Sequence, residues 1–397
     1  FALISIMIYV LINLAGVIYS GGFALSRILH LNIYLCIWII ALFAAFFVMY
    51  GGMATIAWTN VFQASMLLLG GLLLFLIGLQ KVPGGFSSIL GEGQCSHLIL
   101  PASDPDIPWT GLLVLILSTN IWYYCTNQNI NQSTLGAKNQ WHAQIGILFA
   151  GFLWLLIPLA DTFPGLIAFA LNPDLPKDNA FIYAVQELLP TGLVGIVFAV
   201  LCAAVITAIQ AGVNGVSTIF TFDFYQRFIK PGASEKELIR TGRIFTAAVL
   251  LTGAIWAPMV LRFGHIFSYF QECWAFVAIP IATVFVAGIL WKKFHARVAF
   301  VVLLLTFPMF LMPYFLRILH VRINVFNVAG ITLVLTIVLG VILTYIIRPL
   351  AQENNNQLIF SFSSSENSVP GVPFYKKVPF WAVMMILCYA AVYAVFW

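Results

Sequence analysis

Residues Asn120–Asn139 read NIWYYCTNQNINQSTLGAKN, a polar, amide-rich segment that joins two long apolar runs. Asn120, Tyr123 and Tyr124 lie near the end of the first run, and further amides follow them. Lipid cannot hydrogen-bond a side-chain amide, so such groups occur at membrane depth where they line a cavity or pair with one another. A membrane protein with its amides at this point is therefore expected to handle a small polar solute.

The composition is that of a membrane protein. Of the 397 residues, 62% are hydrophobic and only 8% are charged, too few charges to cover a soluble domain of this length. Apolar runs of about 20 residues are long enough to cross the hydrocarbon core of a bilayer. We place them at Phe1–Gly21, Leu31–Tyr50, Ala54–Leu79, Gly111–Tyr124, Ala143–Leu171, Gly192–Phe220, Gly242–Val260, Ile266–Leu290, Val298–Leu316, Val325–Ile347 and Val378–Trp397. We therefore predict an all-α polytopic membrane protein with about 11 transmembrane helices.

The distribution of Lys and Arg predicts the orientation, because cytoplasmic loops carry an excess of positive charge. If Asp223–Arg243 is cytoplasmic, alternating loops place twelve of the 18 Lys and Arg residues inside and six outside. We expect a plasma-membrane (inner-membrane) protein whose chain starts in the cytoplasm and ends outside. The net charge of +5 reflects this asymmetry, and nothing in the sequence indicates nucleic acid binding.

A polar, low-complexity segment, Ala351–Pro373, separates the last apolar run from the others. We predict that residues 1–350 form the transporter core and the helices that follow it, 351–377 a polar cytoplasmic linker, and 378–397 a peripheral C-terminal transmembrane helix. Phe1 is not an initiating Met, and no signal peptide follows it. We therefore expect that further helices precede this chain.

Small and hydroxyl residues cluster in the run Gly192–Phe220, between Ala203 and Thr218. Small residues at spacings of four allow helices to approach closely, which explains most of them. Alternatively, Thr207 and a nearby backbone carbonyl coordinate a small cation, because hard ions prefer oxygen ligands. On composition alone, close packing is the better interpretation.

Asp161 lies within an apolar run, between Pro158 and Pro164. An acid in such a run is a candidate proton or cation site, although near the outer interface water could solvate it instead. Both interpretations stay open. The two prolines indicate a kinked or broken helix, as in many transporters.

Gln271 and Glu272 lie in another apolar run, with Phe267, Tyr269 and Trp274 close by in the sequence. Aromatic rings stack on the C–H faces of a sugar while an amide binds its hydroxyls, so this composition suits a sugar site. The alternative is an aromatic belt at the outer interface. We favour the site, because an amide and an acid in an apolar run are costly without a purpose.

Seven short motifs, in this order along the chain, point to one family. They are Tyr50-Gly51-Gly52-Met53, Trp58–Gln63, Tyr123–Lys138, Phe163-Pro164-Gly165, Phe220–Tyr225, Phe270-Gln271-Glu272 and Trp291-Lys292-Lys293. Together they resemble the sodium/solute symporter family, and within it the sugar branch of bacterial sodium/galactose and animal sodium/glucose cotransporters. The resemblance implies an inverted-repeat fold of five plus five helices with a central site, worked by alternating access. By this comparison the chain opens at the third helix of the first repeat.

The resemblance also implies substrate-binding residues. Asn120 and Gln271 match positions that hydrogen-bond sugar in relatives, Tyr123 matches an inner-gate aromatic residue, and Phe267 an outer-gate one. Trp154 stands where relatives have a lysine that contacts sugar, so the substrate could differ. Further candidates, for gating or secondary roles, are Tyr124, Asp161 and Glu272.

For the ion, the resemblance implies that Ala204, through its carbonyl, and Thr207 coordinate Na+. Ala208 stands where relatives have a second hydroxyl ligand, Asn60 where they have an acid, and Ser133 where an arginine is usual. The loss of an oxygen ligand is expected to weaken a sodium site. The histidines show no ligand spacing, so no metal other than sodium is predicted.

We therefore expect a secondary active transporter that couples Na+ to the uptake of a sugar or polyol. One alternative is a sodium-independent or proton-driven carrier of a related solute, which Ala208 and Asn60 favour. Another is a substrate sensor that does not transport. An enzyme is not expected, because the sequence shows no nucleophile–base pair, metal motif or phosphate-binding loop. The oligomeric state is left open.

Overall fold

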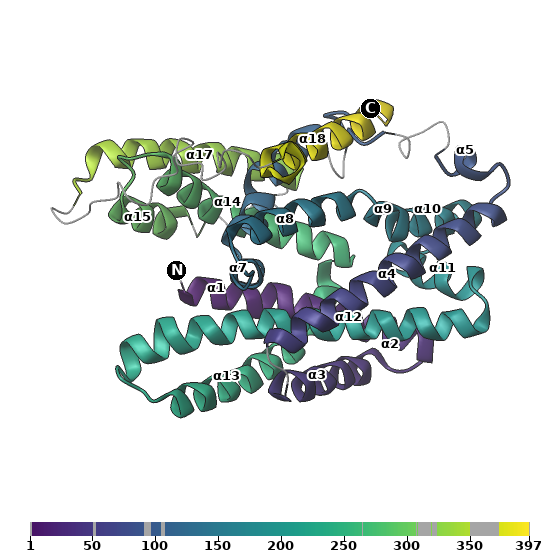
Figure 1. The fold of residues 1–397 in the computed structure, drawn as a ribbon, viewed down its shortest axis with the longest axis horizontal. Coiled ribbons are helices and arrows are strands. Elements are labelled where there is room, and N and C mark those ends of the chain that lie inside the picture. The colour runs from purple at the N-terminus through teal and green to yellow at the C-terminus, as the bar shows by residue number, and fades with distance from the viewer. Residues whose placement is uncertain are drawn as a thin grey trace. The chain divides into compact units, whose positions relative to one another are not determined.

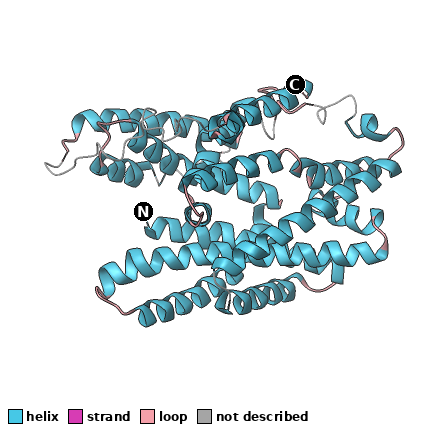
Figure 2. Ribbon diagram, in the orientation of Figure 1, coloured by secondary structure: helices cyan, strands magenta, loops and turns pink. Residues whose placement is uncertain are grey.

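The structure is a computed structural model that describes residues 2–50, 53–90, 97–104, 108–263, 265–306, 308, 319, 324–349 and 373–396 (Figure 1). Throughout these ranges the regular elements are helices, without a strand (Figure 2). Contacts divide the chain into two compact units. The first comprises Phe1–Ser96 and Gly146–Phe270, and the second His97–Ile145 and Gln271–Trp397.

The first unit holds most of the long helices. Its elements are α1 (Ala2–Ile8), η1 (Tyr9–Leu14), α2 (Ala15–Leu29), α3 (Ile33–Tyr50), α4 (Met53–Lys81), α5 (Gly85–Leu90), α9 (Ile157–Ala160), α10 (Thr162–Leu171), η5 (Lys177–Asn179), α11 (Ala180–Leu188), α12 (Thr191–Thr218), η6 (Ile219–Ile229), α13 (Glu235–Trp256) and η7 (Ala257–Phe263). Two further helices, α8 (Gln140–Trp154) and α14 (Ile266–Leu290), are divided between the units.

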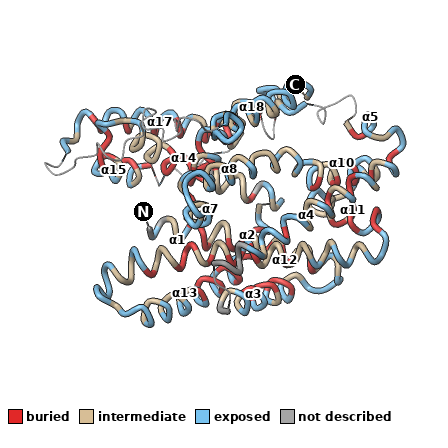
Figure 3. Tube along the Cα trace, viewed as in Figure 1, coloured by how far each residue is buried: buried red, intermediate tan, exposed pale blue. Residues whose placement is uncertain are grey.

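Helix α12 packs against α2, α3, α4 and α13, and the buried residues gather where these helices meet (Figure 3). Small residues allow the close approaches. A Cβ added to Gly22 of α2 would lie 2.8 Å from Ile37 Cγ1 of α3, and one at Gly71 of α4 would collide with the backbone of Ala160. By contrast, Gly212 of α12 has nothing within 4 Å of an added Cβ, so close packing does not explain this glycine.

Helices α12 and α13 form a hairpin through η6, seen in teal in Figure 1. Ser217 Oγ of α12 donates a hydrogen bond to the Gly242 carbonyl of α13 at 3.0 Å. Ser234 and Glu237 form a capping box that satisfies free amides at the start of α13. The hydrogen bond to the Glu237 carboxylate raises the pKa of Lys230 in the preceding turn above its ordinary value.

The second unit is smaller. Besides its parts of α8 and α14, its elements are α6 (Trp109–Val114), η3 (Leu115–Asn120), η4 (Trp122–Thr126), α7 (Gln128–Leu135), α15 (Ala296–Thr306), α17 (Val325–Ile346), η10 (Phe374–Lys376) and α18 (Val378–Val395). One core cluster joins Val114 of α6 to Phe276 and Ile279 of α14 and to α17. A Cβ added to Gly111 would lie 2.6 Å from Phe326 Cβ, so α6 and α17 are in close contact.

The described part of every predicted apolar run contains helix. Among the described residues, seven helices are long and apolar enough to cross a membrane, and α8 with α9–α10 makes an eighth span bent by 46°. Two shorter apolar helices, Ile33–Val48 and Ala296–Thr306, occupy two more of the predicted runs. The elements α6, η3 and η4 occupy the remaining run, Gly111–Tyr124. The break that Pro158 and Pro164 predicted in the bent span is thereby confirmed.

Some predictions fall outside the described residues. Gly51 and Gly52 of one family motif do so, as do residues 351–372 of the predicted linker. None of the residues of α18 is buried. The backbone amide of Leu98 donates to the Phe396 carbonyl at 2.9 Å, and the Trp141 indole to the Lys376 carbonyl at 2.9 Å. The division into core, linker and peripheral helix stays a prediction.

Candidate functional site

In the first unit, polar oxygens converge on Thr207 in the middle of α12. Thr207 is 6% exposed, and its Oγ1 lies 2.5 Å from Gln63 Oε1 of α4. The same hydroxyl lies 3.1 Å from the Ala203 carbonyl and 3.0 Å from the Ala204 carbonyl. A hydroxyl has one proton and can donate it to one acceptor at a time. The hydroxyl therefore has three oxygens within hydrogen-bond distance and can donate to one of them at a time.

Such an arrangement suits a small hard cation. The Thr207 hydroxyl, the Gln63 carboxamide and the two carbonyls of α12 are the type of neutral oxygen ligands that such ions accept. Within the described residues, no group of three or more His, Cys, Asp or Glu side chains could hold a metal. A singly charged ion therefore fits this neutral set better than a divalent one, whose charge calls for carboxylates.

The predicted ion residues differ in their surroundings. Ala204 and Thr207 take part in the oxygen cluster, the first through its carbonyl. Ala208 is exposed and contributes no side-chain oxygen. Asn60, one turn before Gln63 on α4, is also exposed.

Gln63 is a residue for which the sequence predicted no role beyond its place in the Trp58–Gln63 motif. It is 7% exposed, in the middle of the apolar helix α4. A buried amide in an apolar span is costly unless it is hydrogen-bonded, and this was a usable signal in the sequence. Its partner, 144 positions further along the chain, could be found only from the structure.

In the second unit, the predicted substrate residues lie where the helix departs from α geometry. Asn120 ends the π-helix η3 and is exposed, while Tyr123 and Tyr124 lie in the π-helix η4. An extra residue in a helical turn redirects the side chains around it and is frequent at functional sites. The helix then ends at Asn127, which is extended and 3% exposed, and α7 begins at the next residue.

Aromatic rings connect this region to α14. The Tyr123 ring lies 5.7 Å from the Trp274 ring and 5.2 Å from the Tyr124 ring, measured between centroids. Trp274 is three residues after Gln271, which places the two on one face of α14. The structure thus brings Tyr123 to the helical turn that carries Gln271. Glu272, the next residue, is partly buried.

The other candidates lie at helix ends or breaks in the first unit. Trp154 is the last residue of α8 and Phe267 is in the first turn of α14, and both are about half exposed. Asp161 is exposed at the break between α9 and α10, where its Oδ1 accepts a hydrogen bond from Thr162 Oγ1 at 2.8 Å. Solvation of Asp161, the alternative raised above, agrees with this exposure.

One aromatic residue near Gln271 serves another purpose. Tyr269 is 2% exposed, and its hydroxyl donates to the Leu11 carbonyl at 2.6 Å. Leu11 lies in the π-helix η1, where the altered hydrogen-bond pattern makes carbonyls available. Tyr269 therefore fixes the first turn of α14 to η1.

The long apolar helices and the bent span define a polytopic membrane protein, and a buried polar pair inside its bundle is a feature that transporters share. The model of the sodium:solute symporter family matches residues 1–306, and the chain belongs to that family. The relatives are transporters, which confirms the prediction that the chain is not an enzyme.

Two curated relatives illustrate the similarity. The sodium/glucose cotransporter of Vibrio parahaemolyticus is 32% identical over 345 residues, which is 77% of this chain and 62% of the relative. The human sodium/myo-inositol cotransporter 2 is 31% identical over 338 residues, 75% of this chain and 50% of the relative. The chain thus spans between half and two thirds of the length of these relatives.

A solved structure shows the fold. A Na+-coupled sialic acid symporter in a substrate-bound, outward-open state matches with a TM-score of 0.73 at 19% identity. The match covers 88% of this chain and 74% of that one. The predicted inverted-repeat transporter fold is thereby confirmed.

Proposed function

We propose that the protein is a secondary active transporter that couples Na+ to the uptake of a sugar or polyol by alternating access. The observation that carries the proposal is the buried oxygen cluster at Thr207, in a chain whose relatives are sodium cotransporters. The names of those relatives, a glucose and a myo-inositol cotransporter, support a polyhydroxylated solute.

In this proposal Na+ is bound by Thr207 Oγ1, Gln63 Oε1 and the carbonyl of Ala204, with that of Ala203 beside them. The ion supplies the driving force, because it enters down its own gradient and its binding and that of the solute favour each other reciprocally. Ala208 offers no hydroxyl, and Gln63 supplies an oxygen in its place.

The solute is bound by the amides of Asn120 and Gln271, with the ring of Tyr123 stacked on its C–H face. The contact between Tyr123 and Trp274 supports this assignment, because it holds the aromatic platform against the turn of Gln271. Trp154 and Phe267, which belong to the first unit, are assigned to the solute by the family resemblance alone, and Trp154 in place of a lysine favours a neutral solute. Tyr124, Asp161 and Glu272 are assigned to gating or secondary roles.

The experiment follows uptake of labelled galactose, glucose and myo-inositol by the full-length protein in proteoliposomes. Uptake is measured with an inward sodium gradient and again with choline replacing sodium. Uptake that requires sodium supports the proposal. Uptake that is indifferent to sodium supports the second candidate, a proton-driven or uncoupled carrier, which the exposed Ala208 and Asn60 favour.

A third candidate, a sensor that binds the solute without moving it, is distinguished by a binding measurement. Calorimetry with the same solutes would then show sodium-dependent binding while the proteoliposomes show no uptake. Binding without uptake at every sodium concentration would exclude both transport candidates.

We also infer the arrangement in the membrane, with the chain start in the cytoplasm of a plasma membrane and the C-terminus outside. The linker 351–377 would then be cytoplasmic and 378–397 a peripheral span, as the exposure of α18 supports. Cysteines introduced at Lys236 and at Asp174 test this, because a membrane-impermeant thiol reagent should label only the second from outside.

A further inference from the structure

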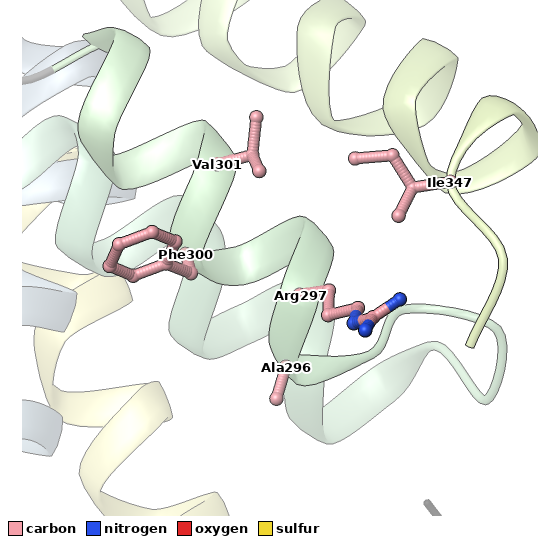
Figure 4. A pocket seen from close by; sticks show the side chains of 5 residues that line it. All are labelled: Ala296, Arg297, Phe300, Val301 and Ile347. Atoms are coloured by element: carbon pink, nitrogen blue, oxygen red, sulfur yellow. The ribbon is translucent and has the colours of Figure 1, made fainter. Parts of the chain in front are cut away.

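A groove opens on the surface of the second unit, between the start of α15 and the end of α17. It has a volume of about 440 Å³ and is lined by Ala296, Arg297, Phe300, Val301 and Ile347 (Figure 4). Four of the five lining side chains are apolar. The exception is the guanidinium of Arg297, which extends along the same gap as Val301 and Ile347 in Figure 4.

The walls of the groove are held in place by the core below it. Phe294, Val298 and Val302 are each less than 5% exposed and pack against Leu343 and Ile347. In addition, the imidazole Nε2 of the buried His295 lies 3.1 Å from the Ile347 carbonyl. The two segments that form the groove are therefore fixed to each other from beneath.

Positive charge lies close to this groove. Lys292 and Lys293 are in the turn shortly before α15, and Arg348 directly follows Ile347; all three are exposed. With Arg297 itself, four cations therefore lie in or beside the groove: Lys292, Lys293, Arg297 and Arg348. Among the described residues, no carboxylate is paired with Arg297.

Aromatic residues mark the same region as a membrane interface. The Lys293 ammonium lies 5.6 Å from the centroid of the Tyr345 ring, and Trp291 lies 6.1 Å from that ring. Trp, Tyr and Lys gather at the level of lipid head groups, where an apolar body and a polar tip are both satisfied. The sequence predicts that this end of the helices faces the cytoplasm.

We propose that this groove binds an anionic phospholipid, with the phosphate on Arg297 and an acyl chain along Phe300, Val301 and Ile347. Charge complementarity argues for this occupant, because the head group must be anionic and the groove beside it apolar. An arginine suits a phosphate better than a lysine does, since its planar group offers paired donors. Lys292 and Arg348 also attract the anionic head group electrostatically, without a defined contact to it.

The test uses native mass spectrometry of the full-length protein titrated with phosphatidylglycerol, and with phosphatidylcholine as the neutral comparison. The unchanged protein should retain phosphatidylglycerol in preference. Arg297→Gln should weaken retention about fivefold, the effect of one cation near an anionic lipid. Arg297→Lys should restore part of it. Arg243 is an exposed residue of α13 in the first unit, so Arg243→Gln removes the same charge elsewhere and should change nothing.

The apolar part of the groove is tested separately by Val301→Trp, which fills the gap and leaves every charge in place. This variant should also lose phosphatidylglycerol, and thermal unfolding verifies that each variant is folded. Equal losses in Arg297→Gln and Arg243→Gln would overturn the proposal in favour of a general charge effect. Retention by Val301→Trp, or full displacement of the lipid by inorganic phosphate, would overturn it as well.

Discussion

Replacement of Gln63 by methionine examines the oxygen cluster at Thr207 most directly. Methionine is similar in length and removes only the polar atoms of the side chain. Gln63 is 7% exposed, and its Oε1 is 2.5 Å from the Thr207 hydroxyl. The variant therefore deletes one oxygen of the proposed sodium site and leaves the packing of α4 on α12 nearly unchanged.

The effect on stability should be small. A typical internal hydrogen bond contributes about 1 kcal/mol to the free energy of unfolding. After the substitution the Thr207 hydroxyl still has the Ala203 carbonyl at 3.1 Å and the Ala204 carbonyl at 3.0 Å as acceptors. We therefore expect Gln63→Met to lower the free energy of unfolding by about 1 kcal/mol or less.

The effect on the affinity for sodium should be much larger. A polar contact to a charged group is worth about 1.5–3 kcal/mol, so losing one should raise the sodium half-saturation constant about 10- to 150-fold. Uptake by proteoliposomes as a function of sodium concentration measures this constant. The rise in melting temperature that sodium produces without any solute gives a second measure, independent of transport.

Two further variants complete the design. Gln210→Met removes an equally buried glutamine of α12 that is not a partner of the Thr207 hydroxyl, so its sodium constant should stay unchanged. Thr207→Val removes the other side-chain oxygen of the proposed site and should raise the sodium constant about as much as Gln63→Met, and the double variant, which lacks both ligands, should raise it further. A Gln63→Met protein whose sodium constant stays within about twofold of the original would refute the assignment. Gln63 would then serve only as a structural hydrogen-bond partner.

Three other predictions concern single sites. Ala208→Ser restores a hydroxyl beside Thr207 and should lower the sodium half-saturation constant by about tenfold, whereas Ala208→Val should not; sodium titration of uptake distinguishes them. Trp274→Ala removes the ring that lies 5.7 Å from Tyr123 and should raise the KM for solute while the sodium constant changes little; Trp274→Phe should recover part of the loss. Ser234→Ala deletes the N-cap of α13 and should reduce the free energy of unfolding by about 1 kcal/mol with uptake unchanged, as thermal unfolding would show; impaired uptake would contradict a purely structural role.

Hydrophobicity was sufficient to place the helices, because each span must be apolar over about 20 residues whatever its neighbours are. The bend at residues 155–156, just before Pro158, was equally local, since proline removes a backbone donor wherever it stands. The contact between Gln63 and Thr207 could not be predicted from such local patterns. Their hydrogen bond depends on which faces of α4 and α12 meet, and that is a property of the packed bundle. The π-helical turns that carry Tyr123 and Tyr124 were missed for the same reason, because tertiary contacts stabilise an extra residue in a turn.

The departures from regular helix explain why some polar residues of the amide-rich segment are poor candidates for the solute. A broken helix in lipid leaves backbone carbonyls that must find donors. The Asn131 amide donates to the Cys125 carbonyl at 2.9 Å, and the Thr126 hydroxyl to the Trp122 carbonyl at 2.8 Å. Both therefore satisfy the backbone around the break at Asn127.

The better candidates for binding the solute are side chains that lie near the break and do not bond to its backbone. Asn120 lies before the break, exposed at the end of a π-helix, and Tyr123 presents its ring toward Trp274. The Asn131 amide satisfies the backbone at the break, and Asn120 and Tyr123 lie before it. A substitution at Asn131 should therefore impair transport through folding rather than through affinity.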